Sequence, residues 1–473
     1  MATVKYEDIL SVFGKHGQEH VLSGWDKLFL DQQEQLLEDC SHVDFKWLDA
    51  RWAEFRAIQS EGVKKVEIEP APVVTLATDE AGAKEKAAAL EMGEDLLRQG
   101  KVAAFLVAGG QGTRLGFNGP KGSYPIGPLS GKTLFQWHAE QILARSRRYG
   151  AIIPWYIMTS RDNDRDTKNF FEENGYFGLN KRDVLFFTQE MVPCLDFNGK
   201  LMLASPSSLA MNPNGHGGSI SGLHRSGAVK NMRERGIEYV SYFQVDNPLV
   251  TICDPLFIGL HAASQSDMSS KVLEKSSPSE KIGVVCIRNG KPAVVEYTDL
   301  DVETMEAKGP DGKLKFWAGS IAIHVLSVSF LEKIGVEGLP WHQNRKKVPY
   351  FAGNRLIKPE QENAVKFETF VFDALPYAKK ALNLEVVREH EFAPVKNAEG
   401  NDSVATCRQL LSNYFCEWLA LRGVSIPVPG MGCDMAAKRP VVEISPLYSL
   451  DAEELATKIK PEGVKLERSM LLG

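Results

Sequence analysis

The chain has 473 residues, of which 43% are hydrophobic and 25% charged, as in ordinary globular proteins. Its net charge of −6 gives no electrostatic reason to expect nucleic acid or an anionic membrane as a partner. No apolar run reaches the ~18 residues of a membrane span, and the opening MATVKYEDIL lacks the basic-then-apolar pattern of a secretion signal. A chain of this length exceeds one hydrophobic core, so we expect two or three domains.

Helices are expected over about the first 60 residues. Trp52 and Phe55 follow Asp44 at helical spacing, and Asp44 is a plausible N-cap. Two prolines in EIEPAPVVTLATD (67–79) predict an extended connector. A second helix is expected over 80–99, where the pattern resumes.

From there on, short apolar runs alternate with helical segments. The expected strands are 102–107, 151–158, 183–188 and 239–244, and the expected helices between them are 133–150, 167–178 and 220–235. Alternating βαβ units predict a mostly parallel sheet with helices on both faces. Hairpins are expected at Asn198-Gly199 and at Asn289-Gly290, because this dipeptide favours tight turns.

The fold class predicted is therefore α/β. We expect a central Rossmann-like sheet, mixed but mostly parallel and flanked by helices. A helical N-terminal region over 1–95 precedes this α/β domain, which is expected over 96–405. The remaining residues, 406–473, contain an expected helix at 408–421 and Pro- and Gly-rich segments, and they predict a small C-terminal domain.

The seven cysteines are odd in number and scattered, and no CxxC pair occurs: Cys40, Cys194, Cys253, Cys286, Cys407, Cys416 and Cys433. This distribution supports neither a disulfide framework nor a cysteine-bound zinc ion. A reducing compartment is the simplest interpretation, so the sequence predicts a soluble, cytoplasmic protein.

A glycine-rich segment, LVAGGQGTRLG (106–116), follows the first clear strand, and PKG (120–122) comes soon after it. Glycine lacks a β-carbon, so backbone N–H groups can approach a nucleotide base or phosphate closely; the glycines concerned are Gly109, Gly110 and Gly112. Arg114 and Lys121 place two cations beside that backbone, and such a pair suits a polyphosphate. The alternative is a purely structural turn.

Two common nucleotide-binding motifs fail on spacing. Gly110, Gly112 and Gly116 give GxGxxxG, whereas the dinucleotide fingerprint requires GxGxxG, which argues against a nicotinamide-dependent dehydrogenase. A Walker A loop ending at Gly131-Lys132-Thr133 would need glycine where Ile126 stands.

The string GGxGTRLGxxxPKG resembles the signature of the UDP-sugar pyrophosphorylases, and the greatest similarity is to the eukaryotic UDP-N-acetylglucosamine type. The resemblance covers nearly the whole chain, because further motifs follow in the family's order: GQEHVLSGWDKL (17–28), FFTQEMVP (186–193), NGHGGSI (214–220), VDNPLV (245–250), VVEY (294–297), AGSIAIH (318–324), FVFDALPYAKK (370–380), EFAPVKNAEG (391–400) and EISPL (443–447). The domain at 96–405 would then be the nucleotide-sugar-binding catalytic domain.

The resemblance implies a magnesium-dependent enzyme that joins UTP and N-acetylglucosamine-1-phosphate, reversibly, into UDP-N-acetylglucosamine and pyrophosphate. The sugar phosphate would attack the α-phosphorus of UTP directly, so catalysis would consist of positioning and charge neutralisation. By the same resemblance, the uracil and ribose lie along the glycine loop and Gln189 reads the base. Arg114 and Lys121 would hold the β- and γ-phosphates, and Lys396 would reach the reacting phosphates. Without the family match, a solvated side chain is the simpler interpretation of Gln189 and Lys396.

Asp246 is the candidate magnesium ligand. It follows the apolar strand YVSYFQV (239–245), and a carboxylate at the C-terminal end of a strand is well placed for Mg²⁺ beside phosphates. Because Asn247-Pro248 follows, a turn or helix-capping aspartate is the alternative.

For the sugar, the resemblance implies His216, Gly217, Gly218, Glu296 and Ser320 in the hexose pocket, with Phe370 and Phe372 near the N-acetyl group. Two of these positions depart from the N-acetylglucosamine enzymes. His216 stands where they usually have asparagine, as in UDP-glucose pyrophosphorylases, and Ser320 replaces another asparagine. The alternatives are therefore a UDP-glucose or broad UDP-sugar pyrophosphorylase, and a non-catalytic relative that binds UDP-sugars.

Overall fold

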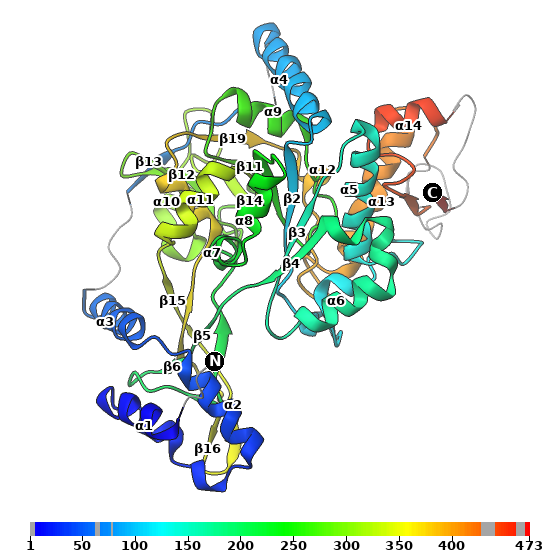
Figure 1. Cartoon of the computed structure of the whole chain (residues 1–473). Helices are drawn as coiled ribbons and strands as arrows, with labels where there is room; N and C mark the ends of the chain where they lie inside the picture. Colours follow the sequence, from blue (N-terminus) through cyan, green and yellow to red (C-terminus); the bar gives the residue numbers. More distant parts are fainter. Residues whose placement is uncertain (1–4, 62–66, 77–78, 427–439, 460–468) are drawn as a thin grey trace. The chain divides into compact units, whose positions relative to one another are not determined.

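The computed structural model describes residues 5–61, 67–76, 79–426, 440–459 and 469–473 (Figure 1). The chain forms two compact units. The larger unit comprises 66–188, 220–337 and 374–473, and the smaller unit comprises 1–65, 189–219 and 338–373. These units cut across the three ranges expected from the sequence, since the smaller one is built from three stretches that are distant along the chain.

A ten-stranded mixed sheet forms the centre of the larger unit, as the α/β prediction required. Its main path runs β1-β12-β14-β10-β2-β3-β4, with β11 pairing β14 and β19, and β13 pairing β12. Four neighbours, β10, β2, β3 and β4, are mutually parallel and carry the expected alternation of strands and helices. The strands are β1 (Ile68–Pro70), β2 (Val102–Val107), β3 (Trp155–Thr159), β4 (Val184–Thr188), β10 (Tyr239–Gln244), β11 (Met268–Glu274), β12 (Val284–Arg288), β13 (Lys291–Val295), β14 (Ala318–Ser327) and β19 (Ala381–Glu385).

Helices cover both faces of this sheet (Figure 1). On one face Trp155 of β3 contacts Phe171, which also packs against Phe135. On the other face the hydroxyl of Tyr156 donates to Asn231 at 2.8 Å. The first face carries α5 (Leu134–Tyr149), α6 (Asp164–Glu173) and α13 (Val404–Ala420), and the second carries α7 (Gly218–Arg225), α8 (Ala228–Glu234) and α11 (Val328–Glu337).

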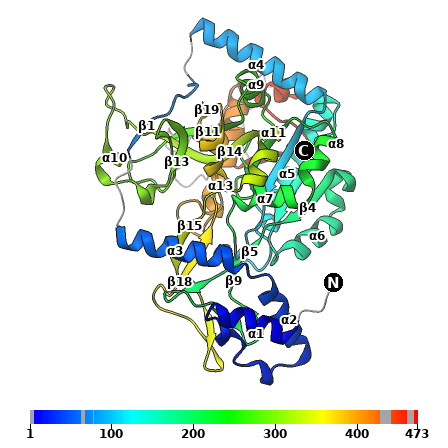
Figure 2. The same ribbon diagram turned by 60° about the vertical axis from the view of Figure 1, so that its left-hand side comes forward.

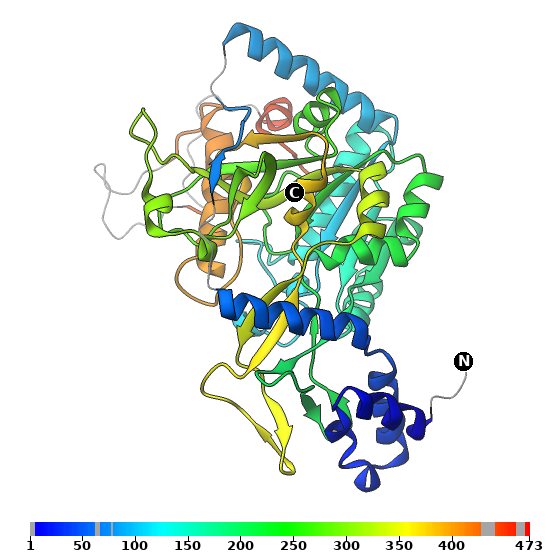
Figure 3. The same cartoon turned by 90° about the vertical axis from the view of Figure 1, so that its left-hand side faces the viewer.

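Helices α4 (Glu80–Arg98) and α9 (Pro255–Ala263) cross in close contact, as Figures 2 and 3 show. A β-carbon on Gly93 would lie 1.8 Å from the Pro255 oxygen, and one on Gly259 would lie 1.6 Å from the Ala89 oxygen. Glycine at both positions is therefore a requirement of packing. The Asp79 side chain caps the start of α4 by accepting from the Gly82 N–H at 2.8 Å.

The C-terminal residues belong to the larger unit. The Glu443 carboxylate accepts from the N–H groups of Leu129 and Ser130 at 2.6 and 2.9 Å, and Lys132 donates to Ser445 at 2.9 Å. The remaining elements of this unit are α10 (Val302–Glu306), α12 (Arg388–Glu391), α14 (Ala452–Lys458), β20 (Val442–Ile444) and β21 (Met470–Leu472).

The smaller unit packs N-terminal helices on short strands around its own core. Phe13, Leu36 and Leu48 are buried together with Leu195 and Phe367. Figure 3 shows its strand pairs β15–β18 and β16–β17 in yellow. The elements are α1 (Tyr6–Lys15), α2 (Leu30–Ser41), α3 (Phe45–Glu61), β5 (Met191–Pro193), β6 (Leu195–Asp196), β7 (Leu203–Ser205), β8 (Ser208–Leu209), β9 (Met211–Pro213), β15 (His342–Lys346), β16 (Tyr350–Ala352), β17 (Arg355–Ile357) and β18 (Ala364–Glu368).

Both predicted turns form. Strands β12 and β13 pair through Asn289 and Gly290, whose φ angles are 53° and 72°, and Leu195 pairs with Leu201 around Gly199. Six cysteines are free and buried, while Cys433 lies outside the described residues. Within the described part of the chain, no helix is both long and apolar enough to span a bilayer.

Candidate functional site

The glycine-rich loop after β2 is held in a defined shape by backbone hydrogen bonds. Gly112 N–H donates to Gly119 at 2.9 Å, and Lys121 N–H donates to Gly110 at 3.1 Å. The buried Asn163 also holds the loop in place, because its side-chain amide donates to the carbonyls of Ala108 and Gly110 at 2.9 and 3.2 Å. The loop is thus preorganised by its own chain.

The glycines of this segment have different roles. A β-carbon on Gly112 would lie 2.7 Å from the Phe117 ring, and one on Gly122 would lie 2.2 Å from the Phe135 ring, so these two are needed for packing. A β-carbon on Gly110 would come no closer than 4.0 Å to its nearest neighbour, Lys121. Packing therefore does not require glycine at position 110.

Lys121 and Asp246 form an ion pair at the C-terminal edge of the parallel strands. The Lys121 Nζ lies 3.0 Å from the Asp246 Oδ2, and the two side chains are only 16% and 15% exposed. Arg114 lies on a 3₁₀ turn (Thr113–Leu115) and is exposed. The loop therefore presents one paired, half-buried cation and one exposed cation.

Asp246 is held ionised by its surroundings. Burial alone would raise the pKa of its carboxyl group, but the charges of Lys121 and Lys396 and the hydrogen bond from Lys121 outweigh burial, so the pKa lies below its usual value. A carboxylate ionised at neutral pH is the state that a divalent cation requires.

The Lys396 segment is attached directly to the Asp246 segment. Val395 N–H donates to the Asp246 carbonyl at 2.9 Å. Next to it, the buried Asn247 side chain donates to the Glu391 carbonyl at 2.7 Å and accepts from the Ala393 N–H at 3.0 Å. This amide clamp fixes the chain that leads to Lys396, although 144 residues separate Asn247 from Glu391.

The residues present fit a magnesium ion that is shared with phosphates. No group of three or more His, Cys, Asp or Glu side chains that could enclose a metal occurs among the described residues. Mg²⁺ commonly binds one or two carboxylates and takes its other ligands from phosphate and water. Asp246 is an ionised carboxylate of the kind that such an ion uses.

Two of the expected sugar-binding residues lie in the larger unit. Glu296 follows β13, and Ser320 lies on β14, where its N–H donates to the Gly283 carbonyl at 2.8 Å. A β-carbon on Gly283 would lie 3.2 Å from a carboxylate oxygen of Glu296. Gly283 therefore lies next to both Glu296 and Ser320.

The GHGG segment of the smaller unit packs backbone to backbone on the residues before Phe370. Gly217 N–H donates to the Thr369 carbonyl at 2.8 Å. β-carbons would lie 2.6 Å from the Phe370 nitrogen at Gly217 and 1.8 Å from the Asn214 side-chain oxygen at Gly218. Both glycines are thus required by packing, whether or not a sugar also contacts them.

This packing assembles an aromatic cluster, which we define as His216, His342, Phe370 and Phe372. Phe370 and Phe372 stack with ring centroids 5.2 Å apart, and His216 lies 5.2 Å from Phe370. His216 accepts from the Val371 N–H at 3.2 Å through Nδ1, so its Nε2 carries the proton. Burial and then the charge of His342 lower the pKa of His216 to about 4, so it is neutral at pH 7.

Gln189 is buried in the smaller unit directly after β4, with 8% of its surface exposed, so the solvated alternative is wrong. Sequence reasoning missed Asn163, Asn247 and His138, the last of which bonds the Val245 carbonyl beside Asp246 at 3.1 Å. Asn247 adjoins Asp246 in the VDN string, but its partners are far along the chain and no local pattern reveals them.

A sequence profile of the UTP–glucose-1-phosphate uridylyltransferase family matches residues 50–413. The chain belongs to this family. It is 38% identical to the UDP-N-acetylhexosamine pyrophosphorylase-like protein 1 of Xenopus tropicalis, over 95% of this chain and 93% of that protein. Its identity to the UDP-N-acetylglucosamine pyrophosphorylase of Saccharomyces cerevisiae is 34%, over 89% and 92%.

The fold agrees with a solved member of the family. The crystal structure of the UDP-N-acetylglucosamine pyrophosphorylase of Trypanosoma brucei, in complex with an inhibitor, matches with a TM-score of 0.81. The two chains are 27% identical, and the match covers 96% of this chain and 94% of that one. This uridylyltransferase therefore has the family's α/β fold, as the resemblance predicted.

Proposed function

We propose that this enzyme transfers UMP from UTP to N-acetylglucosamine-1-phosphate, releasing pyrophosphate, in a reversible reaction. The observation that carries the proposal is the Lys121–Asp246 ion pair beside a preorganised glycine loop, within a chain of the uridylyltransferase family. The Lys396 side chain is 44% exposed and pairs with Asp402 at 3.6 Å, and its charge lowers the pKa of Asp246. The names of the relatives support an N-acetylated sugar.

The chain's own residues would bring two polyphosphates together by neutralising charge. Lys121 would exchange Asp246 for a phosphate oxygen when UTP binds, and Arg114, which is exposed on the loop, would grip the same phosphates. Lys396 would stabilise the charge that develops on the transferred phosphate. Direct attack by the sugar phosphate needs no enzyme nucleophile. The described cysteines agree with this, since each is buried and burial raises the pKa of Cys253, for example, to about 12.

Magnesium would bind at Asp246 and neutralise the phosphates of UTP. A single ionised carboxylate suits an ion that takes its other ligands from the substrate. The base would be read by Gln189, whose amide can donate and accept along the uracil edge. Because CTP presents a donor where uracil presents an acceptor, UTP would be preferred over CTP.

The residues that the resemblance assigns to the sugar support relaxed specificity. The aromatic cluster offers Phe370 and Phe372 to the methyl of an N-acetyl group, whereas neutral His216 has only its Nε2–H to donate. Serine at position 320 is shorter than the asparagine usual in the N-acetylglucosamine enzymes and leaves room for water. A pocket with space for the acetamido group tolerates its absence, so we propose glucose-1-phosphate as a second substrate.

Pyrophosphate release from UTP with a panel of sugar-1-phosphates tests the proposal. N-acetylglucosamine-1-phosphate should give the largest kcat/KM, and glucose-1-phosphate a smaller one. The double variant His216→Asn with Ser320→Asn should sharpen the preference for the N-acetyl sugar. Wild-type enzyme that accepts glucose-1-phosphate and rejects the N-acetyl sugar would instead identify a UDP-glucose pyrophosphorylase. No pyrophosphate release with any sugar phosphate would identify a non-catalytic relative that binds UDP-sugars.

We further propose that the enzyme works in the cytoplasm. Support comes from the six described cysteines, which are free thiols and show no disulfide. Proteins of oxidising compartments commonly carry disulfides. Fractionation of cells that express the tagged chain, with activity recovered in the cytosolic fraction, is the direct check.

A further inference from the structure

A cluster of four buried charges lies inside the larger unit, formed by residues of β11 and α5 and by the ends of α9 and α12. At its centre is Lys271 on β11, whose side chain is fully buried. The Lys271 Nζ lies 2.8 Å from the Asp254 carboxylate and 2.5 Å from the Glu391 carboxylate, and these two side chains are 17% and 10% exposed. Arg145, which is also buried, supplies the second positive charge. The cluster therefore balances two cations against two carboxylates.

Lys271 and Asp254 keep each other charged. Burial would lower the pKa of Lys271, but the charges of Asp254 and Glu391 and their hydrogen bonds outweigh burial, so the pKa lies above its usual value. Burial would raise the pKa of Asp254, but Lys271 and, to a smaller extent, the charge of Arg145 outweigh it, so the pKa lies below its usual value. Lys271 is thus a cation in the interior of the fold.

Stability alone does not explain this cluster. Removing ions from water costs about as much as their mutual attraction returns, so buried ion pairs commonly give no more stability than apolar side chains of the same volume. An ion pair can instead fix the geometry between the segments that it joins. The role of Lys271 therefore depends on which segments it joins.

One carboxylate partner of Lys271 lies on the segment that follows Asp246. The Asp254 side chain caps α9, because it accepts from the Leu256 N–H at 3.0 Å. Asp254 therefore anchors the far end of the stretch that begins at Asp246, the candidate magnesium ligand.

The other carboxylate partner of Lys271 lies on the segment that leads to Lys396. Glu391 is the last residue of α12 and the first residue of the string EFAPVK, which ends at Lys396. Its second carboxylate oxygen accepts from the Thr251 N–H at 3.2 Å, so Glu391 also bonds the segment that follows Asp246. Lys271 thus fastens both segments to β11 at once.

We propose that Lys271 is a positioning residue for the transfer of UMP, an inference that rests on the proposed roles of Asp246 and Lys396. Through its two carboxylate partners, Lys271 holds Asp246 and Lys396 at a fixed separation. The Lys396 side chain is partly exposed, so its place depends on the backbone that carries it. A shift of that backbone by ~1 Å is enough to slow the reaction by up to ~10²-fold.

Two variants separate positioning from charge balance. In Lys271→Met, two buried carboxylates share only the charge of Arg145, so stability towards urea should fall. Adding Glu391→Gln restores the balance of charge, and stability should return towards that of the wild type. In both variants kcat should be at least ~10-fold below the wild-type value, while the KM for UTP changes little.

A merely structural role of Lys271 predicts a different result. In that case kcat would recover together with stability in the double variant, and such a recovery would refute the proposal. The double variant alone decides if Lys271→Met does not fold.

Hydrogen exchange tests the positioning without relying on activity. The Val395 N–H donates to the Asp246 carbonyl and the Ala393 N–H donates to the Asn247 side chain. Both amides should exchange at least ~10-fold faster in the double variant, and unchanged exchange would overturn the proposal. Wild-type protein that is inactive with every sugar phosphate would contradict the proposed function instead, whereas the exchange rates would still decide the role of Lys271.

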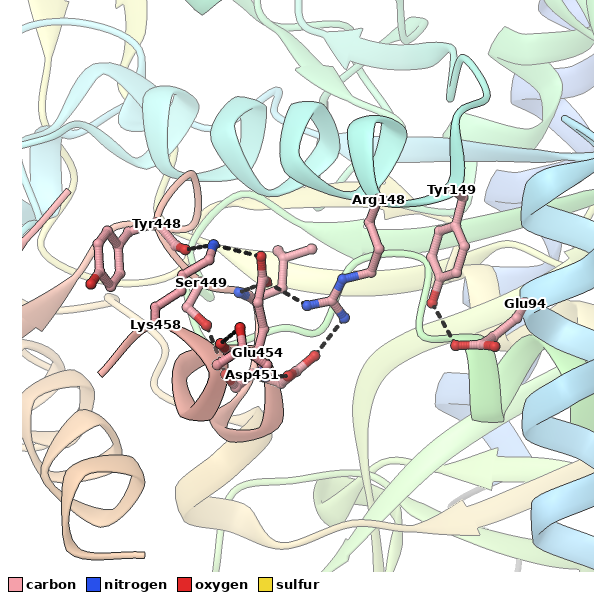
Figure 4. A network of polar contacts seen from close by, with 10 residues as sticks. Glu94, Arg148, Tyr149, Tyr448, Ser449, Asp451, Glu454 and Lys458 are labelled. Atoms are coloured by element: carbon pink, nitrogen blue, oxygen red, sulfur yellow. Dashed lines mark hydrogen bonds and ion pairs between the residues drawn. The ribbon is translucent and has the colours of Figure 1, made fainter. Parts of the chain in front are cut away.

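The matched control is Arg148, an ion-paired cation elsewhere in the same unit. Figure 4 shows Arg148 reaching the carboxylates of Asp451 and Glu454, each at 2.5 Å. These two bonds fasten the start of α14 to α5. Arg148→Met should therefore lower stability and leave both kcat and the exchange of the Val395 amide unchanged. A fall in kcat as large as that of the double variant would show that losing any ion pair slows the enzyme, and would overturn the specific role of Lys271.

Discussion

Replacing Asn247 by alanine should lower both the stability of the protein and its turnover. The side chain is 4% exposed and makes two hydrogen bonds to backbone, to the Glu391 carbonyl at 2.7 Å and from the Ala393 N–H at 3.0 Å. Alanine removes both partners and leaves the two backbone groups buried. Three residues beyond Ala393 lies Lys396, so the damage reaches the candidate site.

The magnitude follows from the two lost bonds. A buried backbone group left without a partner costs about 1–3 kcal/mol, so the loss of both partners in Asn247→Ala should lower the free energy of unfolding by roughly 2–6 kcal/mol. Displacement of a catalytic group by ~1 Å can reduce the rate by ~10²-fold. We therefore expect kcat to fall by about that factor, while the affinity for UTP changes less.

Urea unfolding and steady-state kinetics measure the two effects. The matched control is Asn363→Ala in the smaller unit, because Asn363 clamps backbone in the same way, bonding the Val348 N–H at 2.8 Å and the Val348 carbonyl at 3.0 Å. This control should lose some stability and keep its kcat. Asn247→Ala that loses stability yet retains wild-type kcat would refute the clamp as the device that positions Lys396.

Three further outcomes are expected. Asp246→Ala should abolish most of the magnesium-dependent activity while circular dichroism stays native, and unchanged turnover would remove Asp246 from the metal site. Arg114→Ala and Lys396→Ala should each lower kcat/KM by ~10²-fold or more, which corresponds to about 2.7 kcal/mol of transition-state stabilisation. For Lys396→Ala the loss should fall on kcat. A variant that loses only its affinity for UTP would contradict the proposed role of Lys396. Burial lowers the pKa of His138 from 6.5 to about 4. The unfolded chain therefore binds a proton that the folded chain does not, and stability should fall by up to ~3 kcal/mol as the pH drops from 6.5 to 4. His138→Gln should flatten this decline in denaturant titrations at pH 7 and 5, and an unaltered pH dependence would show that other groups cause it.

The sequence predicted helices, strands and turns well where neighbouring residues determine them. The Asn289-Gly290 turn formed because both of its residues adopt positive φ. The helix expected at 408–421 begins earlier, at Val404, because Ser403 and Thr406 cap it reciprocally. The strand expected at 151–158 begins only at Trp155, since Ile152 is exposed and Pro154 has no N–H to give to a ladder.

Long-range organisation was not readable in the same way. The core of the smaller unit joins Phe13 and Leu36 to Leu195 and Phe367. The hydrophobic periodicity of the sequence does not predict contacts between residues so far apart along the chain. The site shows the same division. Motifs located Lys121, Asp246 and Lys396, whereas the Asn247 clamp depends on partners more than 140 residues away.

Exchange of radiolabelled pyrophosphate into UTP tests the central claim of direct transfer to N-acetylglucosamine-1-phosphate. The enzyme is incubated with UTP, labelled pyrophosphate and magnesium, with and without the sugar phosphate. Direct attack predicts that label enters UTP only when N-acetylglucosamine-1-phosphate is present, because no step can release pyrophosphate without it. Label entering UTP in the absence of the sugar phosphate would reveal a uridylyl-enzyme intermediate, and no exchange in its presence would contradict the assigned reaction.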